Sequence, residues 1–234
     1  MRKYLAFDIE IAKDIPNGVS DLMSYRPLGI TCAATSTRGG QPRLWHGWDA
    51  RGGIAGRMTP QEAQELVRYL RQAMENGYTI LTWNGVGFDF DILGEESGLV
   101  DECRELALDH VDMMFHFFCL NGFPLALNKA AKGMGLSGKS SDVNGALAPK
   151  MWAAGRRQEV LDYVAQDSRT VLEVAEAIES QRAISWTSNR GNLNRLPMPR
   201  LLTVREALDL PLPDTSWMRD PWPRRKFVGW LATT

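Results

Sequence analysis

The stretch KYLAFDIE at residues 3–10 decides the fold, because it has the pattern of a buried strand that carries two acids at its C-terminal end. Asp8 and Glu10 are two positions apart, so they share one face of the strand, opposite the apolar side chains next to them. Two carboxylates on a buried strand are costly unless they are paired or bind a metal. Strands also end in acids that simply reach solvent, so this segment alone leaves both interpretations open.

The segments that follow predict a mixed α/β sheet covered by helices. Residues 28–36 and 41–48 have the composition of strands and would form an antiparallel meander with the first strand. Thr59–Glu62 has the sequence of a capping box, with proline at the first helical position, and Asn76-Gly77 ends this helix. A fourth strand is expected at 78–83, and helical patterns lie at 88–98, 102–119, 125–132 and 157–181.

A third acidic position follows the fourth strand, in the sequence NGVGFD at residues 84–89. The glycines would let the backbone approach a substrate closely, and Asp89 would begin a helix. An acid at a helix start can equally serve the helix macrodipole. Asp91 is a rival ligand, but it lies two residues further along the helix and should face away from Asp89.

A fourth acidic position lies in the sequence YVAQD at residues 163–167. The spacing of four places Tyr163 and Asp167 on one face of the last long helix, within its apolar stripe. An aspartate in such a stripe is not surface decoration. It is either a functional group or a buried carboxylate that is hydrogen-bonded to Tyr163.

In this order and spacing, the three segments resemble the motifs of the DEDDy branch of DnaQ-like 3′→5′ exonucleases. Phe7–Glu10 matches the first motif, Asn84–Asp89 the second, and Tyr163 with Asp167 the third. The resemblance covers about residues 3–180 and is closest to stand-alone exonucleases related to the proofreading domain of family B DNA polymerases. It implies a ribonuclease H-like fold. One position departs from the family pattern, because Ile11 stands where Thr or Ser is usual.

The resemblance also implies a two-metal-ion hydrolase. Two Mg²⁺ or Mn²⁺ ions roughly 3.5–4 Å apart can generate a nucleophile at neutral pH and stabilise the leaving oxygen, and such ions prefer oxygen ligands. Asp8 would bridge both ions, Glu10 and Asp167 would complete the ion that activates water, and Asp89 would hold the other. Tyr163 would orient the water. The expected catalytic residues are therefore Asp8, Glu10, Asp89, Tyr163 and Asp167, and the four acids are the expected metal ligands.

The expected reaction is the release of nucleoside monophosphates from the 3′ end of single-stranded nucleic acid, with DNA favoured over RNA. Asn84, Phe88 and Lys139 are candidate substrate contacts, although Asn84 could instead fix its turn. Lys139 lies in Gly133–Ser140, which fits the P-loop pattern. A P-loop requires a strand before it and a helix after it, whereas a helix precedes this segment, so we do not expect a nucleotide-binding loop.

Composition is that of a globular protein, with 44% hydrophobic and 24% charged residues and a net charge of −1. No apolar run reaches the roughly 18 residues of a membrane span, and the N-terminus does not resemble a signal peptide. The three cysteines are odd in number and lie in apolar surroundings, as expected of reduced thiols. We therefore expect a cytoplasmic protein that does not bind membranes.

The chain divides by composition into residues 1–181, the expected exonuclease domain, and a Pro/Trp/Arg-rich extension at 182–234. The extension has nine Lys/Arg against four Asp/Glu, and four of the eight tryptophans. Aromatic and basic residues that alternate suit single-strand binding. Packing of the tryptophans onto the domain is the interpretation that we favour.

Two alternatives to a DNA exonuclease stay open at this point. A ribonuclease D-like enzyme would use the same site on an RNA 3′ end, and no residue pattern reads the sugar recognisably. A nucleic-acid-binding module could also keep the fold without catalysis. The presence of all five motif residues argues against a catalytically silent protein.

Overall fold

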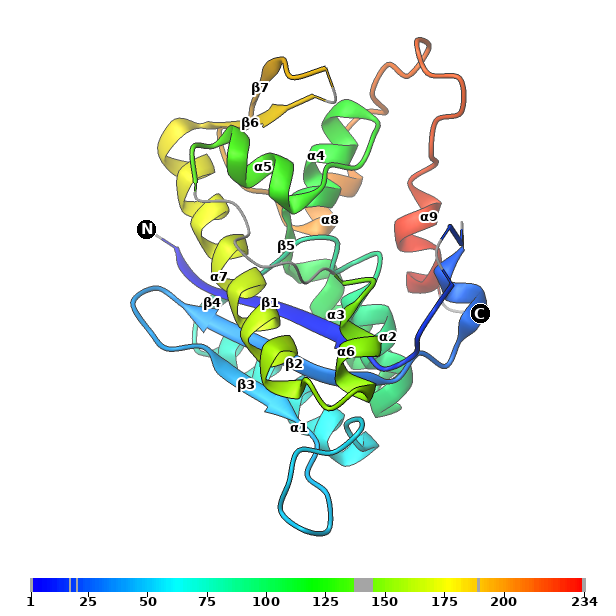
Figure 1. Cartoon of the computed structure of the whole chain (residues 1–234). Coiled ribbons are helices and arrows are strands. Elements are labelled where there is room, and N and C mark those ends of the chain that lie inside the picture. Colours follow the sequence, from blue (N-terminus) through cyan, green and yellow to red (C-terminus); the bar gives the residue numbers. More distant parts are fainter. Residues whose placement is uncertain (1, 17, 20, 137–144, 189, 233–234) are drawn as a thin grey trace.

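The computed structural model describes residues 2–16, 18–19, 21–136, 145–188 and 190–232. Within these residues the centre of the fold is a five-stranded mixed sheet with the order β3-β2-β1-β4-β5 (Figure 1). β1 (Lys3–Ile11), β2 (Ile30–Thr37) and β3 (Arg43–His46) form the predicted antiparallel meander. β4 (Tyr78–Thr82) and β5 (Val111–Asp112) run parallel to β1, so the C-terminal ends of these three strands meet at one edge.

Helices cover both faces of this sheet. α7 (Arg157–Gln181) crosses one face, over β1 and β2, and α1 (Pro60–Glu75), α2 (Asp89–Ser97) and α3 (Val100–Asp109) lie on the other (Figure 1). α1 begins at the predicted capping box, in which Thr59 and Glu62 bond each other's backbone N–H groups. The predicted fold class, a mixed sheet with antiparallel first strands and flanking helices, is confirmed.

The region predicted as one helix at 102–119 is in fact interrupted. α3 ends at Asp109, β5 follows, and α4 (Met113–Asn121) then begins with Asp112 as its N-cap. The periodicity alone could not show the break, because β5 is only two residues long. The predicted helix at 125–132 is α5 (Leu127–Gly133), and α6 (Ala148–Ala153) is a helix that no sequence pattern indicates.

The extension contains more regular structure than its composition indicates. β6 (Ala183–Thr187) and β7 (Leu193–Pro197) pair as a separate antiparallel hairpin. A short helix, α8 (Val204–Leu208), begins after Thr203 and has a capping box. α9 (Arg225–Val228) is the last α-helix of the described chain. Leu202, Val204, Ala207 and Phe227 of the extension are buried in the same hydrophobic cluster as β1.

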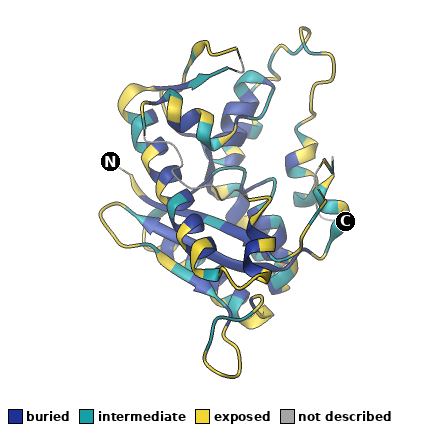
Figure 2. Cartoon of the chain, viewed as in Figure 1, coloured by how far each residue is buried: buried dark blue, intermediate teal, exposed yellow. Residues whose placement is uncertain are grey.

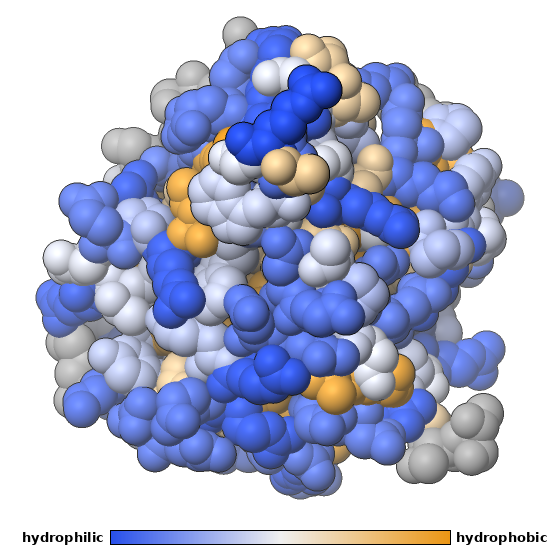
Figure 3. All heavy atoms as spheres, turned by 90° about the horizontal axis from the view of Figure 1, so that it is seen from below, coloured by the Kyte–Doolittle hydropathy of each residue, from blue (hydrophilic) through white to orange (hydrophobic). Residues whose placement is uncertain are grey.

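Burial follows this arrangement. The strands and the inward sides of the helices are buried, and the loops and the outer helix faces are exposed (Figure 2). The face seen from below is largely hydrophilic, with hydrophobic side chains in small separate patches (Figure 3). No helix among the described residues combines the length and apolar character that a membrane crossing needs.

Candidate active site

Three carboxylates from two elements meet above the central strand. Asp8 and Glu10 lie on the face of β1 that α7 covers, and Asp167 lies on α7. One oxygen from each carboxylate lies within 4.8 Å of the others. Glu10 and Asp167 are only 6% and 7% exposed. Like charges this close repel each other in a partly dehydrated site, so the cluster favours a bound cation.

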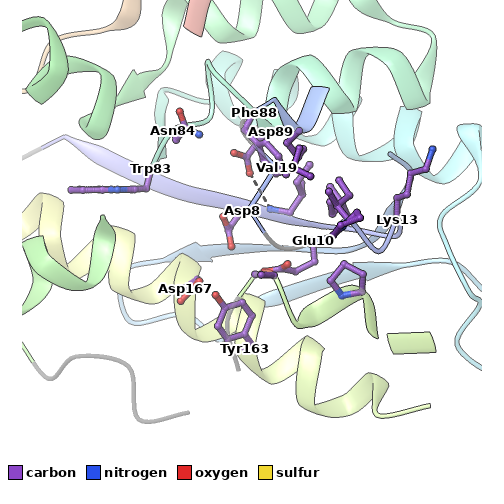
Figure 4. Close-up of a pocket in the computed structure, with 18 of the residues that line it drawn as sticks. Asp8, Glu10, Lys13, Val19, Trp83, Asn84, Phe88, Asp89, Tyr163 and Asp167 are labelled. Carbon is purple, nitrogen blue, oxygen red and sulfur yellow. Dashed lines mark hydrogen bonds between the residues drawn. The ribbon is translucent and has the colours of Figure 1, made fainter. Parts of the chain in front are cut away.

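A fourth carboxylate, that of Asp89, reaches β1 from the first turn of α2. Its Oδ1 accepts a hydrogen bond from the backbone N–H of Ile9 at 3.0 Å. The pairing of β1 with β4 ends at Ala6, so the N–H of Ile9 has no strand partner on that side. Figure 4 shows Asp8 between Asp89 and Asp167. Burial, and then the nearby charge of Asp112, raise the pKa of Asp89 to about 7.

Tyr163 closes the α7 side of the cluster. Its side chain is 5% exposed and points toward the carboxylates (Figure 4). Burial raises the pKa of Tyr163 well above its usual value, and the charges of Asp167, Glu10 and Asp8 and a hydrogen bond with Asp167 raise it further. The phenol therefore stays protonated at physiological pH and can act as a hydrogen-bond donor.

The turn after β4 is held by a buried acid that the sequence does not single out. Asp112, at the end of β5, accepts hydrogen bonds from the backbone N–H groups of Asn84 at 3.0 Å and Val86 at 2.9 Å. It also caps α4 by accepting from the N–H of Phe115 at 2.9 Å. Burial raises the pKa of Asp112 to about 6. An aspartate directly before an apolar helical run is a typical N-cap, and that is the one signal of its role in the sequence.

Two features of the turn explain its residue types. Asn84 has a φ of 76°, in the left-handed region that asparagine tolerates better than most residues. A Cβ at Gly87 would lie 2.6 Å from Asn84 Oδ1 and 2.8 Å from Phe227 Cδ1, so any other residue there would have to displace these two side chains. Trp230 holds the turn from outside by donating its indole N–H to the carbonyl of Val86 at 2.6 Å.

The four carboxylates and Tyr163 line a cleft of about 400 Å³. This volume lies within the range of roughly 300–1,000 Å³ that is typical of small-molecule sites. The lining combines the acidic cluster and Tyr163 with apolar side chains that include Ile11, Ile15 and Val19, here called the apolar wall. The cleft also reaches Trp83, Asn84, Phe88 and Lys13 (Figure 4). The segment after β1 and Pro149 of α6 thus join the site, although the sequence indicates neither.

The structure places the other sequence candidates as follows. Phe88 and Asn84 line the cleft, whereas Lys139 lies outside the described residues. Asp91 faces away from Asp89, as predicted, and pairs with Arg26. Gly133 ends a helix, and a Cβ there would lie 2.3 Å from the backbone of β6, so close packing explains this glycine.

The donor set fits a divalent cation. All four candidate ligands are carboxylates, and the hard ions Mg²⁺ and Mn²⁺ prefer oxygen donors. Three of these groups already lie close enough to share one ion. The acidic cluster is therefore compatible with metal binding, and Asp8, Glu10 and Asp167 would be the groups that hold the ion.

The chain matches the RNase H superfamily over residues 55–178, which is more than half of its length. The match includes Asn84, Asp89, Tyr163 and Asp167 and begins after β1. A search of curated proteins finds no match.

Among solved structures, the chain is similar to the family B DNA polymerase from the hyperthermophilic archaeon Pyrobaculum calidifontis, with a TM-score of 0.54 and 20% identity. The similarity covers 76% of this chain and 24% of the polymerase, and at this identity it concerns the fold alone. Escherichia coli exonuclease I in complex with a dT13 oligonucleotide aligns with a TM-score of 0.34 and 16% identity, over 84% of this chain and 50% of the exonuclease. The chain thus spans about a quarter of the polymerase and about half of exonuclease I.

Proposed function

The chain belongs to the RNase H superfamily, and from that premise we propose that it is a metal-dependent 3′→5′ exonuclease of the DEDDy type. Its substrate is the 3′ end of single-stranded nucleic acid, with DNA favoured, and its products are nucleoside monophosphates. The observation that carries the proposal is the convergence of four carboxylates and one tyrosine, from β1, α2 and α7, on one cleft. The direction of degradation and the preference for DNA rest on the resemblance of the three motifs to DnaQ-like exonucleases.

The acidic residues have distinct tasks in this proposal. Asp8, Glu10 and Asp167 would hold one Mg²⁺ or Mn²⁺ ion, and Asp89 together with Asp8 would hold a second. When bound, the metal supplies an activated water and neutralises charge on the scissile phosphate. Without a cation, four carboxylates at one site would repel a phosphodiester, so the chain's own charge makes activity depend on metal.

Tyr163 and the apolar wall have positioning tasks. The phenol of Tyr163 stays protonated and hydrogen-bonded to Asp167, so it does not act as a base, and its oxygen orients the attacking water. The apolar wall that includes Ile11, Ile15 and Val19 excludes bulk water and offers a surface for the terminal base. Phe88 and Asn84 at the rim contact the same nucleotide.

The direct test is degradation of end-labelled single strands of DNA and RNA with Mg²⁺, with Mn²⁺ and with excess chelator. A 5′ label should yield a ladder that shortens from the 3′ end, and a 3′ label should be released as mononucleotide. Chelator should abolish both. Cleavage of a closed circular strand, or activity that survives chelator, would contradict the proposal. The rates on DNA and RNA strands at equal concentration show which of the two the enzyme prefers.

A further inference from the structure

The four tryptophans of the extension fall into two groups. Trp186 packs edge-on against Phe117 with 5.0 Å between ring centroids, and Trp230 is fixed to the turn at Val86. Trp217 and Trp222, in contrast, are 67% and 42% exposed. Packing onto the domain therefore explains Trp186 and Trp230. It does not explain why the segment from Trp217 to Lys226 presents two large rings to solvent.

The same segment carries three exposed cations and one exposed acid, Asp220. Arg219, Arg225 and Lys226 are exposed, and no ion pair within the described part of the chain involves them. Lys226 Nζ lies 3.3 Å from the centroid of the Trp222 ring. Arg224 differs, because it donates to backbone carbonyls that include those of Leu208 and Leu210 and so fixes the base of the segment.

This segment is connected to the turn beside the cleft through Phe227. Trp222 and Phe227 lie with 6.0 Å between ring centroids. Phe227 in turn packs directly against Gly87, in the turn whose Phe88 lines the cleft. The turn that carries Phe88 thus lies between the cleft and Trp222.

We propose that Trp217, Arg219, Trp222, Arg225 and Lys226 form a binding surface for the part of a single strand that lies outside the cleft, in which Trp222 stacks on a base and Arg225 and Lys226 contact phosphates. This inference rests on the proposed function, because it assumes a single strand whose 3′ end is bound in the cleft. Exposed rings with adjacent cations are the two elements of single-strand binding, stacking on the π-face and neutralisation of the backbone. Their positive charge also complements a polyanion that the acidic body of the chain would otherwise repel.

The test compares binding with turnover. The full chain carrying Asp8→Ala, which should not degrade DNA, is titrated with labelled single strands of DNA and of RNA, each longer than the roughly 4–16 nucleotides of a single-strand groove. Adding Trp222→Ala should raise Kd by about tenfold, and Trp222→Phe should restore most of the affinity. Arg225→Ala with Lys226→Ala should reduce the slope of log K against log salt by about 0.7 for each phosphate that is no longer neutralised. Trp48→Ala is the matched control, because Trp48 is 63% exposed in the loop after β3, away from α9 (Figure 1).

In the active chain, the surface variants should raise KM on long strands and leave kcat and the hydrolysis of a dinucleotide unchanged. Equal losses on long and short substrates would show a structural role, and unchanged Kd would overturn the surface. If Trp222→Ala weakens binding tenfold but the chain with intact carboxylates degrades no nucleic acid, the binding surface is supported and the exonuclease proposal is overturned. If that chain degrades 3′ ends but Trp222→Ala leaves Kd unchanged, the exonuclease is supported and the surface is overturned. If RNA alone binds through Trp222, the strand is RNA.

Discussion

Asp89 Oδ1 accepts a 3.0 Å hydrogen bond from the backbone N–H of Ile9, midway between the two acidic positions of β1. Asp89 comes eighty residues later in the chain, yet this bond fixes it to the strand that carries Asp8 and Glu10. The pairing of β4 with β1 ends at Ala6, so the N–H of Ile9 is available to bond the Asp89 carboxylate and hold it in place. The neutral amide of asparagine could accept the same bond, which separates the structural role of Asp89 from its charge.

We therefore predict that Asp89→Asn keeps the fold and loses the activity. The bond from Ile9 is retained, and the cost of burying a carboxylate charge, which raises the pKa of Asp89 to about 7, is removed. The metal-free variant should unfold at the same temperature as the wild type or a higher one, while turnover falls by at least about a hundredfold because an ion ligand is removed. Calorimetric melting and turnover at saturating Mn²⁺ measure the two effects, and a variant with near-normal turnover would remove Asp89 from the ligands.

Asp8→Ala and Asp167→Ala should each lower turnover by several orders of magnitude with little change in the circular dichroism spectrum. Each change removes one of three carboxylates that lie within 4.8 Å of one another, and with it the contribution of an ion. Asp91→Ala is the control, because Asp91 pairs with Arg26 away from the cleft. If Asp91→Ala reduces turnover as much as Asp8→Ala does, the ligand set must be revised.

Asp112→Ala should destabilise the protein and, through the turn, impair substrate binding. The substitution leaves the N–H groups of Asn84, Val86 and Phe115 without their acceptor. We expect a decrease of about 2–4 kcal/mol in the free energy of unfolding, measured in urea. Asp109→Ala is the matched control, since its ion pair with Arg205 is solvent-exposed and should contribute less than about 1 kcal/mol. Equal effects for the two variants would show that the turn does not depend on Asp112.

Asp112 also illustrates what the sequence can and cannot predict. The sheet, the helix after Thr59 and the long helix with Tyr163 and Asp167 follow from local periodicity and capping, and the structure confirms them. Asp112 acts through hydrogen bonds with residues that are 26 and 28 positions away, and no local pattern encodes such long-range bonds. The apolar wall that includes Ile15 and Val19 comes from a segment without regular periodicity, so only the fold shows that it faces the cleft.

The most discriminating variant of the site is Tyr163→Phe, which should lose much activity and keep metal binding. Phenylalanine keeps the ring, so the packing of α7 stays intact, and the carboxylates of Asp8, Glu10 and Asp167 remain in place. Only the hydroxyl is removed, and with it the hydrogen bond to Asp167 and the contact that we propose holds the water in line with the phosphorus. Removal of one positioning interaction should reduce the rate by roughly ten- to a thousandfold, or about 1.4–4 kcal/mol.

Because Tyr163 stays protonated, the rate of the Phe variant should show the same dependence on pH as that of the wild type. Turnover at saturating Mn²⁺ and metal titration by calorimetry measure the two properties separately. Turnover equal to the wild type would make Tyr163 a packing residue only. Loss of metal affinity would instead mean that the phenol acts by supporting Asp167 through their hydrogen bond, and another group in the cleft would then have to orient the water.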